Sequence, residues 1–268
     1  MMRNVWQKWS FGGALLALGI VPAAAQTPRP YQQVPVTYDR TAATDPALTA
    51  LVAKLKESVG NSDLDPVFAA LSANVAVISC PADPLAACAP GKRGVRQTPQ
   101  SLSPTERLRQ GLCCGDMPKA EITEAIRVET VTGQLAAALE ADSIGAHPDI
   151  AGLACLPAWP ILDRTKATAA ARAAGIEREN LRVTTEDIIL RTRPAEDAPE
   201  ALRLPPGQIA PFMTDLAENV PDGWYAIALP KGGLGYSDQV GLNELAPSGL
   251  CFAREGDTWK IALFVMRS

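Results

Sequence analysis

The sequence predicts an α+β protein in which a helix-rich α+β domain, residues 45–180, precedes a small antiparallel β domain, residues 181–268. Apolar residues in the first part recur mainly at helical spacing behind capping residues. After residue 181, short runs of alternating apolar and polar residues are separated by Gly, Pro, Asn or Asp. The 47% hydrophobic and 20% charged residues form an ordinary globular composition, sufficient to bury a core.

The first 25 residues predict a secretory signal peptide. Arg3 and Lys8 precede an apolar stretch over residues 12–21, and Ala23-Ala24-Ala25 before Gln26 forms a small-residue cleavage site. The stretch is shorter than the roughly 18 to 20 residues that span a bilayer, which argues against the alternative of a retained membrane anchor. We therefore expect a periplasmic or secreted mature chain that begins at Gln26 and has no membrane insertion.

The charge balance of the mature chain argues against nucleic acid as a partner. Without Arg3 and Lys8 the chain retains 23 basic and 29 acidic residues, a net charge of −6. Nucleic acids and anionic membranes draw their affinity from clustered Lys and Arg side chains. We therefore expect no nucleic-acid binding.

Several prolines and no periodicity predict an extended linker over residues 26–44, before the first domain. A buried strand is expected over residues 74–79, and a helix after Pro118 that takes in Ile122 and runs toward Leu139 with a possible break at Gly133. The other expected helices each follow a capping residue: Asp45 before 46–60, Asp65 before 66–71, Ser103 with Glu106 before 104–114, and Asp163 before 164–174.

Six cysteines in an exported chain predict up to three disulfides, for which 15 connectivities are possible. Adjacent Cys113 and Cys114 would close a strained ring, so we expect them to bond elsewhere. Pairing with Cys80 and Cys88 would leave a Cys155–Cys251 bond between the N-terminal region and the last hairpin. No C-x₂-C spacing and a single histidine predict no metal site, and no motif indicates a cofactor.

Four motifs in the C-terminal part resemble the bacterial SH3-like domain: residues 187–194 with a Leu-Arg-x-x-Pro turn, residues 204–207, the Gly223-Trp224 pair and the Gly235-Tyr236 pair. The resemblance covers residues 187–242. It implies a small SH3-like β-barrel, in which glycines allow sharp strand bends and aromatic residues fill a small interior. The tail over residues 250–261 looks like an extra hairpin that ends a group of exported bacterial proteins of unassigned function.

Aromatic residues of this β domain are the candidate ligand-binding residues. Phe212, Trp224, Tyr225 and Tyr236 could stack on sugar rings or hold a Pro-containing peptide if they share one face. The alternative is that Trp224 and Tyr236 belong to the core. Adjacent residues of a strand point to opposite faces, so Tyr225 is the better candidate for a surface contact.

Two catalytic arrangements were considered. His147 is the only histidine, which leaves a Cys114, His147, Asp149 triad as a formal possibility that a disulfide at Cys114 would remove. Paired carboxylates could act as a glycosidase without histidine, although charged residues on a helix are usually its solvated side. The candidate carboxylates on one expected helical stretch are Glu121, Glu124, Glu129 and Glu140.

These observations predict a non-catalytic periplasmic binding protein, with a cell-wall peptide or an envelope protein as the ligand. The ligand class follows from the SH3-like resemblance and the expected compartment. The alternative functions are an envelope hydrolase of glycosidase type that uses acidic residues of the N-terminal domain, and an interaction protein that presents only a partner surface.

Overall fold

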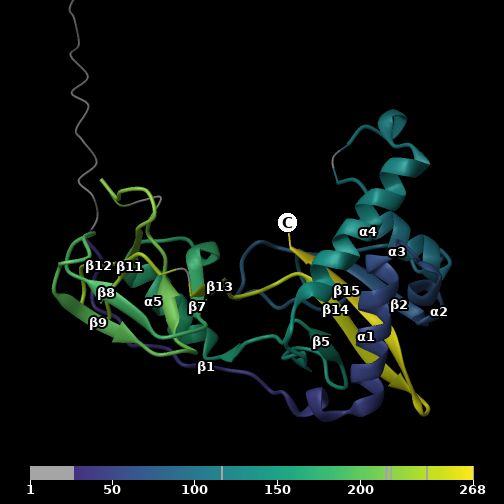
Figure 1. Ribbon diagram of the computed structural model, residues 1–268, viewed down its shortest axis with the longest axis horizontal. Coiled ribbons are helices and arrows are strands. Elements are labelled where there is room, and N and C mark those ends of the chain that lie inside the picture. The colour runs from purple at the N-terminus through teal and green to yellow at the C-terminus, as the bar shows by residue number, and fades with distance from the viewer. Residues whose placement is uncertain (1–26, 116, 215–216, 218, 240, 268) are drawn as a thin grey trace, which may run out of the picture.

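The computed structural model describes residues 27–115, 117–214, 217, 219–239 and 241–267. The predicted signal peptide and its cleavage site lie outside these residues. Figure 1 shows two lobes side by side, with the C-terminus between them. We call them the six-stranded lobe, which contains the largest sheet and the helices α1 to α4, and the two-sheet lobe, which contains two smaller sheets and the helix α5.

A mixed six-stranded sheet organises the six-stranded lobe, with the strand order β3-β2-β15-β14-β5-β4. The neighbouring strands β2 and β15 are parallel to one another, and the other neighbouring pairs are antiparallel. The strands are β2 (Leu71–Cys80), β3 (Arg96–Gln97), β4 (Gly145–Ala146), β5 (Ala154–Leu156), β14 (Gly249–Glu255) and β15 (Thr258–Arg267).

The C-terminal hairpin β14–β15 belongs to this sheet and not to the β domain in which the sequence analysis placed it. β15 pairs with β2 from Ile261 to Arg267, and β14 pairs with β5. A strand from the N-terminal part of the chain and the last strand are therefore neighbours in the largest sheet. The chain leaves this lobe, builds the two-sheet lobe and returns.

Different groups pack on the two faces of the six-stranded sheet. Alternate side chains of a strand point to opposite faces. Val75 and Val77 of β2 and Phe264 of β15 pack under the helices. Ile78 and Val265 point to the other side, where they meet two disulfides and Trp159. The covering helices are α1 (Pro46–Gly60), α2 (Asp65–Ala69), α3 (Pro104–Leu112) and α4 (Glu124–Glu140).

Most of the expected caps are confirmed. The Asp45 side chain accepts hydrogen bonds from the first turn of α1, and Ser103 with Glu106 forms the capping box of α3. Asp163 caps α5 (Arg164–Ala174), which ends at Gly175 with φ of 76°. Asp65 instead lies inside α2 and caps nothing, and α4 continues through Gly133 without a break.

The two-sheet lobe contains two antiparallel sheets, with the strand orders β10-β7-β13 and β11-β12-β8-β9. The helix α5 packs in the core of the first sheet. A two-stranded pair, β1 (Val36–Thr37) with β6 (Ile161–Leu162), joins the same core. The remaining strands are β7 (Leu181–Thr184), β8 (Ile188–Arg191), β9 (Glu200–Leu204), β10 (Ile209–Pro211), β11 (Tyr225–Ala228), β12 (Leu234–Ser237) and β13 (Leu242–Glu244).

The predicted fold class, with a helix-rich N-terminal domain, is wrong. Four sheets and five α-helices make the described chain mainly β-sheet. The error arose because the strands β14 and β15, which complete the first lobe's sheet, lie some 170 residues after β2. In the described residues, the strands of the two-sheet lobe form two sheets that an isolated bridge between Phe212 and Ile227 connects, instead of one closed barrel.

The segment expected to be a linker packs along the two-sheet lobe. Val34 is fully buried, and the Tyr31 hydroxyl donates to the Ala228 carbonyl at 2.9 Å. Burial raises the pKa of Tyr31 above its ordinary value. Among the described helices, none has the length and apolar character needed to cross a bilayer.

Candidate functional site

The predicted aromatic site is only partly assembled. The rings of Phe212 and Tyr225 lie 5.8 Å apart between centroids, and the Arg182 guanidinium lies 5.6 Å from the centroid of the Phe212 ring. All three side chains come from the two-sheet lobe. They form a short row of two rings and one cation, which is a contact expected to contribute modestly to stability.

Tyr236 and Tyr225 lie on opposite sides of the β11–β12 ladder. In this ladder Ala226 is the direct partner of Tyr236, whereas Tyr225 faces Ser237. Tyr236 packs against the core beside α5 and is half-buried. Trp224 precedes β11 and is also half-buried. The four aromatic residues therefore do not share one face.

The acidic residues considered for hydrolysis are exposed, and Glu124 is paired. Glu124 forms ion pairs with Arg109 at 3.5 Å and Arg127 at 3.4 Å, and Glu121 precedes α4 in a separate short helix. Glu106 lines the same 620 Å³ cavity as Glu124, but it completes the capping box. Hydrogen bonds from Ser103 lower the pKa of Glu106, opposite to what a general acid requires.

The six cysteines form three disulfides. Cys155–Cys251 is confirmed, and it joins directly opposite residues of β5 and β14. The expectation for the other four is wrong, because Cys80 bonds to Cys88 and Cys113 bonds to Cys114. The bonded Cys114 cannot act as the nucleophile of a triad.

The candidate site lies between the lobes, where three adjacent cavities form what we call the interlobe cleft. Their volumes are about 540, 340 and 380 Å³. The first two share Pro160, and the last two share Pro84, Leu245 and Arg267. Clefts between domains are the usual place for a ligand.

Four segments bring polar side chains to the 340 Å³ cavity, which is lined by Asp149, Trp159, Arg164 and Arg267. His147 lies on the same loop as Asp149 but does not line the cavity. His147 and Asp149 lie on the loop between β4 and β5, which the hydrogen bond from the His147 N–H to the Leu153 carbonyl closes. Trp159 lies on the segment between β5 and β6, where the chain passes from the six-stranded lobe to the two-sheet lobe. Arg164 is the first residue of α5, and Arg267 is the last residue of β15.

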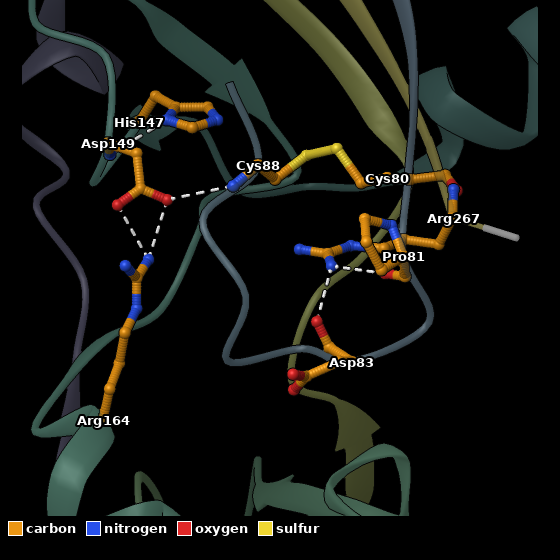
Figure 2. Close-up of a disulfide and its surroundings, with 9 residues drawn as sticks. Cys80, Pro81, Asp83, Cys88, His147, Asp149, Arg164 and Arg267 are labelled. Carbon is orange, nitrogen blue, oxygen red and sulfur yellow. Dashed lines mark hydrogen bonds and ion pairs between the residues drawn. A yellow bond between two sulfur atoms is a disulfide. The ribbon is translucent and has the colours of Figure 1, made fainter. Parts of the chain in front are cut away.

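Asp149 ties the two lobes together. Figure 2 shows its carboxylate between the guanidinium of Arg164, at 2.7 and 2.8 Å, and the Cys88 N–H, at 3.4 Å. Burial acts to raise the pKa of Asp149, but the hydrogen bonds and positive charge of Arg164 outweigh it and lower the pKa below its usual value. Arg178 and Asp83 form a second ion pair between the lobes.

His147 is a buried neutral base with a defined tautomer. The side chain is 4% exposed, and burial lowers its pKa to about 4. Nδ1 accepts a hydrogen bond from the Asp149 backbone N–H at 3.1 Å, so the neutral ring carries its proton on Nε2. Nδ1 therefore does not bond the Asp149 carboxylate, as a catalytic triad would require.

Buried donors without an acceptor gather at Trp159. In the described part of the chain, four buried side-chain nitrogens have no hydrogen-bond partner, and three of them are His147 Nε2, Trp159 Nε1 and Arg267 Nε. The His147 ring lies 4.5 Å from the Trp159 ring between centroids, and the Arg267 guanidinium lies 5.4 Å from the Trp159 ring centroid. We call these three residues the Trp159 cluster.

The fourth nitrogen, Trp259 Nε1, has a different setting. It lies near the Asp45 carboxylate, whose pKa is lowered by hydrogen bonds from the Leu48 and Ala47 N–H groups although burial acts to raise it. Unpartnered buried polar groups are rare in folded proteins and call for an explanation. The Trp159 cluster is the place where that explanation is needed.

All three nitrogens of the Trp159 cluster carry a hydrogen and offer no lone pair. Trp159 and Arg267 line the 340 Å³ cavity, and the second guanidinium on its wall belongs to Arg164. Burial lowers the pKa of Arg267 to about 10, which leaves its guanidinium charged at neutral pH. The chemistry of this donor set suits an oxygen acceptor, above all a carboxylate.

The sequence analysis identified His147 and Asp149 but missed Trp159, Arg164 and Arg267. None of these three residues carries a local sequence signal. Trp159 lies in the segment that connects the two lobes, Arg164 begins α5, and Arg267 ends β15. Within the described ranges, no group of three His, Cys, Asp or Glu residues could hold a metal ion. Comparison of the chain with known protein families, with curated proteins and with solved structures found no match.

Proposed function

We propose that the chain is an exported, non-catalytic binding protein whose interlobe cleft holds the free carboxylate end of a cell-wall peptide. The observation that carries the proposal is the Trp159 cluster, where three buried donors lack an acceptor. A periplasmic location is part of the proposal. Three disulfides support it, because disulfides persist in oxidising compartments.

A carboxylate is the ligand group that best matches the cleft. It accepts several hydrogen bonds and offers none, whereas the Trp159 cluster donates and accepts nothing on its unpartnered nitrogens. Charged Arg267 and Arg164 add electrostatic attraction on the wall of the same cavity.

A peptide is favoured by the remaining walls of the cleft. Proline and aliphatic side chains line the 340 Å³ cavity beside the two guanidiniums. Such walls bury apolar side chains next to a polar end group, as in sites that capture a chain terminus. The cell wall is the envelope material that presents many short peptides with free carboxylate ends, which agrees with the ligand class expected from the sequence.

The test is calorimetric binding of the mature chain to soluble stem peptides released from peptidoglycan. One peptide has a free C-terminal carboxylate, and a matched peptide has a C-terminal amide. The variant Trp159→Phe removes one donor and keeps an aromatic ring. Its control is Trp224→Phe, which alters a half-buried tryptophan of the two-sheet lobe outside the cleft.

We expect the free carboxylate peptide to bind and the amide to bind about tenfold more weakly or not at all, since one hydrogen bond to a charged group is worth about 1.5 to 3 kcal/mol. Trp159→Phe should weaken binding by a similar factor and Trp224→Phe should not. Equal binding of both peptides would contradict the proposal. No binding of either would also contradict it, and an envelope protein would then be sought by crosslinking.

A further inference from the structure

The end of α3 carries a disulfide between neighbouring residues of the chain. Cys113 follows α3 directly and bonds to Cys114. Cys114 has φ of 82°, in the left-handed region that residues other than glycine rarely adopt, and Gly115 follows with φ of 51°. Backbone in this region is held by its surroundings and is concentrated at functional sites.

Only this disulfide is accessible. Cys155 and Cys251 are fully buried, and Cys80 and Cys88 are at most 1% exposed. Cys113 and Cys114 are half-buried. An external thiol can therefore reach the sulfur atoms of one bond and not those of the other two.

The accessible bond has little to do with holding the fold together. A disulfide stabilises a protein mainly by restricting the unfolded chain, and the restriction grows with the length of the loop that it closes. Cys155–Cys251 spans 96 positions, whereas Cys113 and Cys114 are one position apart. The small ring that they form hardly restricts the unfolded chain. Stabilisation of the fold therefore does not explain why this disulfide is present.

The bond lies in a groove between α3, α4 and the sheet. Two cavities of about 690 and 620 Å³ meet here and share Gln110, Cys113, Gly115 and Met117. Thr130 and Gln134 of α4 and Met266 of β15 line the larger one. A cavity of this size can admit a small molecule or part of a peptide.

The α3 wall of the groove is held rigidly. Buried Arg107 donates to the carbonyls of Ala73 and Val75 in β2, at 2.9 and 2.7 Å. One turn later Gly111 brings the α3 backbone directly onto β2, where an added Cβ would lie 2.3 Å from Val77 Cγ1. The position of Cys113 therefore does not depend on its own disulfide.

We infer that Cys113–Cys114 is a site of thiol–disulfide exchange for a thiol-bearing ligand that enters this groove. The thiolate of the ligand attacks one cysteine sulfur, forms a mixed disulfide with it and breaks the Cys113–Cys114 bond. A second thiolate attacks the ligand sulfur of the mixed disulfide. Two thiols are oxidised to one disulfide, and both cysteines end as thiols that take up the two protons released.

The cavities indicate which sulfur is attacked. Cys113 lines both of them, and Cys114 lines only the larger one. The attack is therefore assigned to Cys113, with Cys114 as the leaving thiol. Guanidiniums of Arg96 and Arg109 line the two cavities and favour the thiolate form. Neither cysteine lines the interlobe cleft, so this site does not depend on the proposed peptide binding.

The test treats the folded, oxidised mature chain with reduced glutathione and, in a second arm, with a short cysteine-containing peptide. The free thiols are then alkylated and the labelled positions are found by mass spectrometry. We expect label at Cys113 and Cys114 alone, while the bonds of Cys80 and Cys155 stay intact as internal controls. The arm that reacts faster distinguishes a small thiol from a peptide thiol as the ligand.

Two variants test the order of attack. With oxidised glutathione in place of the reduced form, Cys114→Ser should form a mixed disulfide at Cys113 and release one reduced glutathione, and Cys113→Ser should form much less at Cys114. Equal amounts would overturn the assignment of Cys113. The exchange site itself would be overturned if neither cysteine were labelled under conditions that reduce an exposed reference disulfide. It would also be overturned if all six cysteines were labelled to the same extent.

Discussion

The single histidine gives the candidate site a measurable pH dependence. Burial lowers the pKa of His147 to about 4 in the folded chain, whereas an unfolded chain has a histidine pKa of about 6.5. Between these values the unfolded state binds the proton more readily, so the free energy of unfolding falls as the pH falls. The full effect is about 3 kcal/mol, and about 2 kcal/mol is lost between about pH 7 and pH 5.

The variant His147→Asn removes the titration and can keep an acceptor for the Asp149 N–H in place of Nδ1. Urea unfolding of both proteins at about pH 7 and pH 5 measures the prediction. The free energy of unfolding should fall by about 2 kcal/mol more in the natural chain than in His147→Asn, since carboxyl groups contribute equally to both. Equal losses in the two proteins would refute the account of a buried neutral imidazole. Asp149 has a lowered pKa and affects stability only below about pH 4, outside this window.

Two further predictions concern the six-stranded lobe. Replacing Cys155 and Cys251 by alanine should lower the free energy of unfolding by about 4 to 5 kcal/mol, against about 2 to 3 for Cys80 and Cys88, because the loops span 96 and 8 positions. Urea unfolding measures both values, and the reverse order would contradict the chain-entropy argument. Gly111→Ala should cost about 1 to 3 kcal/mol, because its Cβ would overlap a methyl group of β2. An unchanged unfolding midpoint would contradict the close contact of α3 with β2.

Local features of the fold could be predicted from the sequence. The caps at Asp45, Ser103 and Asp163 depend on residues within one helical turn, and all three are confirmed. The end of α5 at Gly175 is equally local. Where a helix begins or ends is decided by side chains that are neighbours in the chain.

The sheet could not be predicted in the same way. The parallel pair of the six-stranded sheet joins β2 and β15, and a strand pattern carries no record of its distant partner. The last hairpin, β14–β15, was predicted to belong with the strands that precede it. Without these two strands the first lobe was predicted to be helix-rich. The two-sheet lobe has strands at the positions that the SH3-like motifs indicate, and the resemblance itself remains a prediction.

The candidate site, like the fold, could be predicted from the sequence only in part. The pairing of Cys155 with Cys251 was predicted, but adjacent Cys113 and Cys114 were expected to avoid one another because their ring is strained. Trp159 is surrounded by segments that lie far apart in the sequence. A cluster that forms only when these segments come together has no signal in any one of them.

The unpartnered donors beside the cleft are the basis of the proposed peptide binding, and the indole N–H of Trp159 reports on them. The measurement is a ¹H–¹⁵N NMR titration of the mature chain with the free carboxylate stem peptide, in which Trp159→Phe identifies the resonance. The account predicts that the Trp159 signal shifts in proportion to binding and does not move with the amide peptide. A Trp159 signal that stays fixed while the carboxylate peptide binds would contradict it.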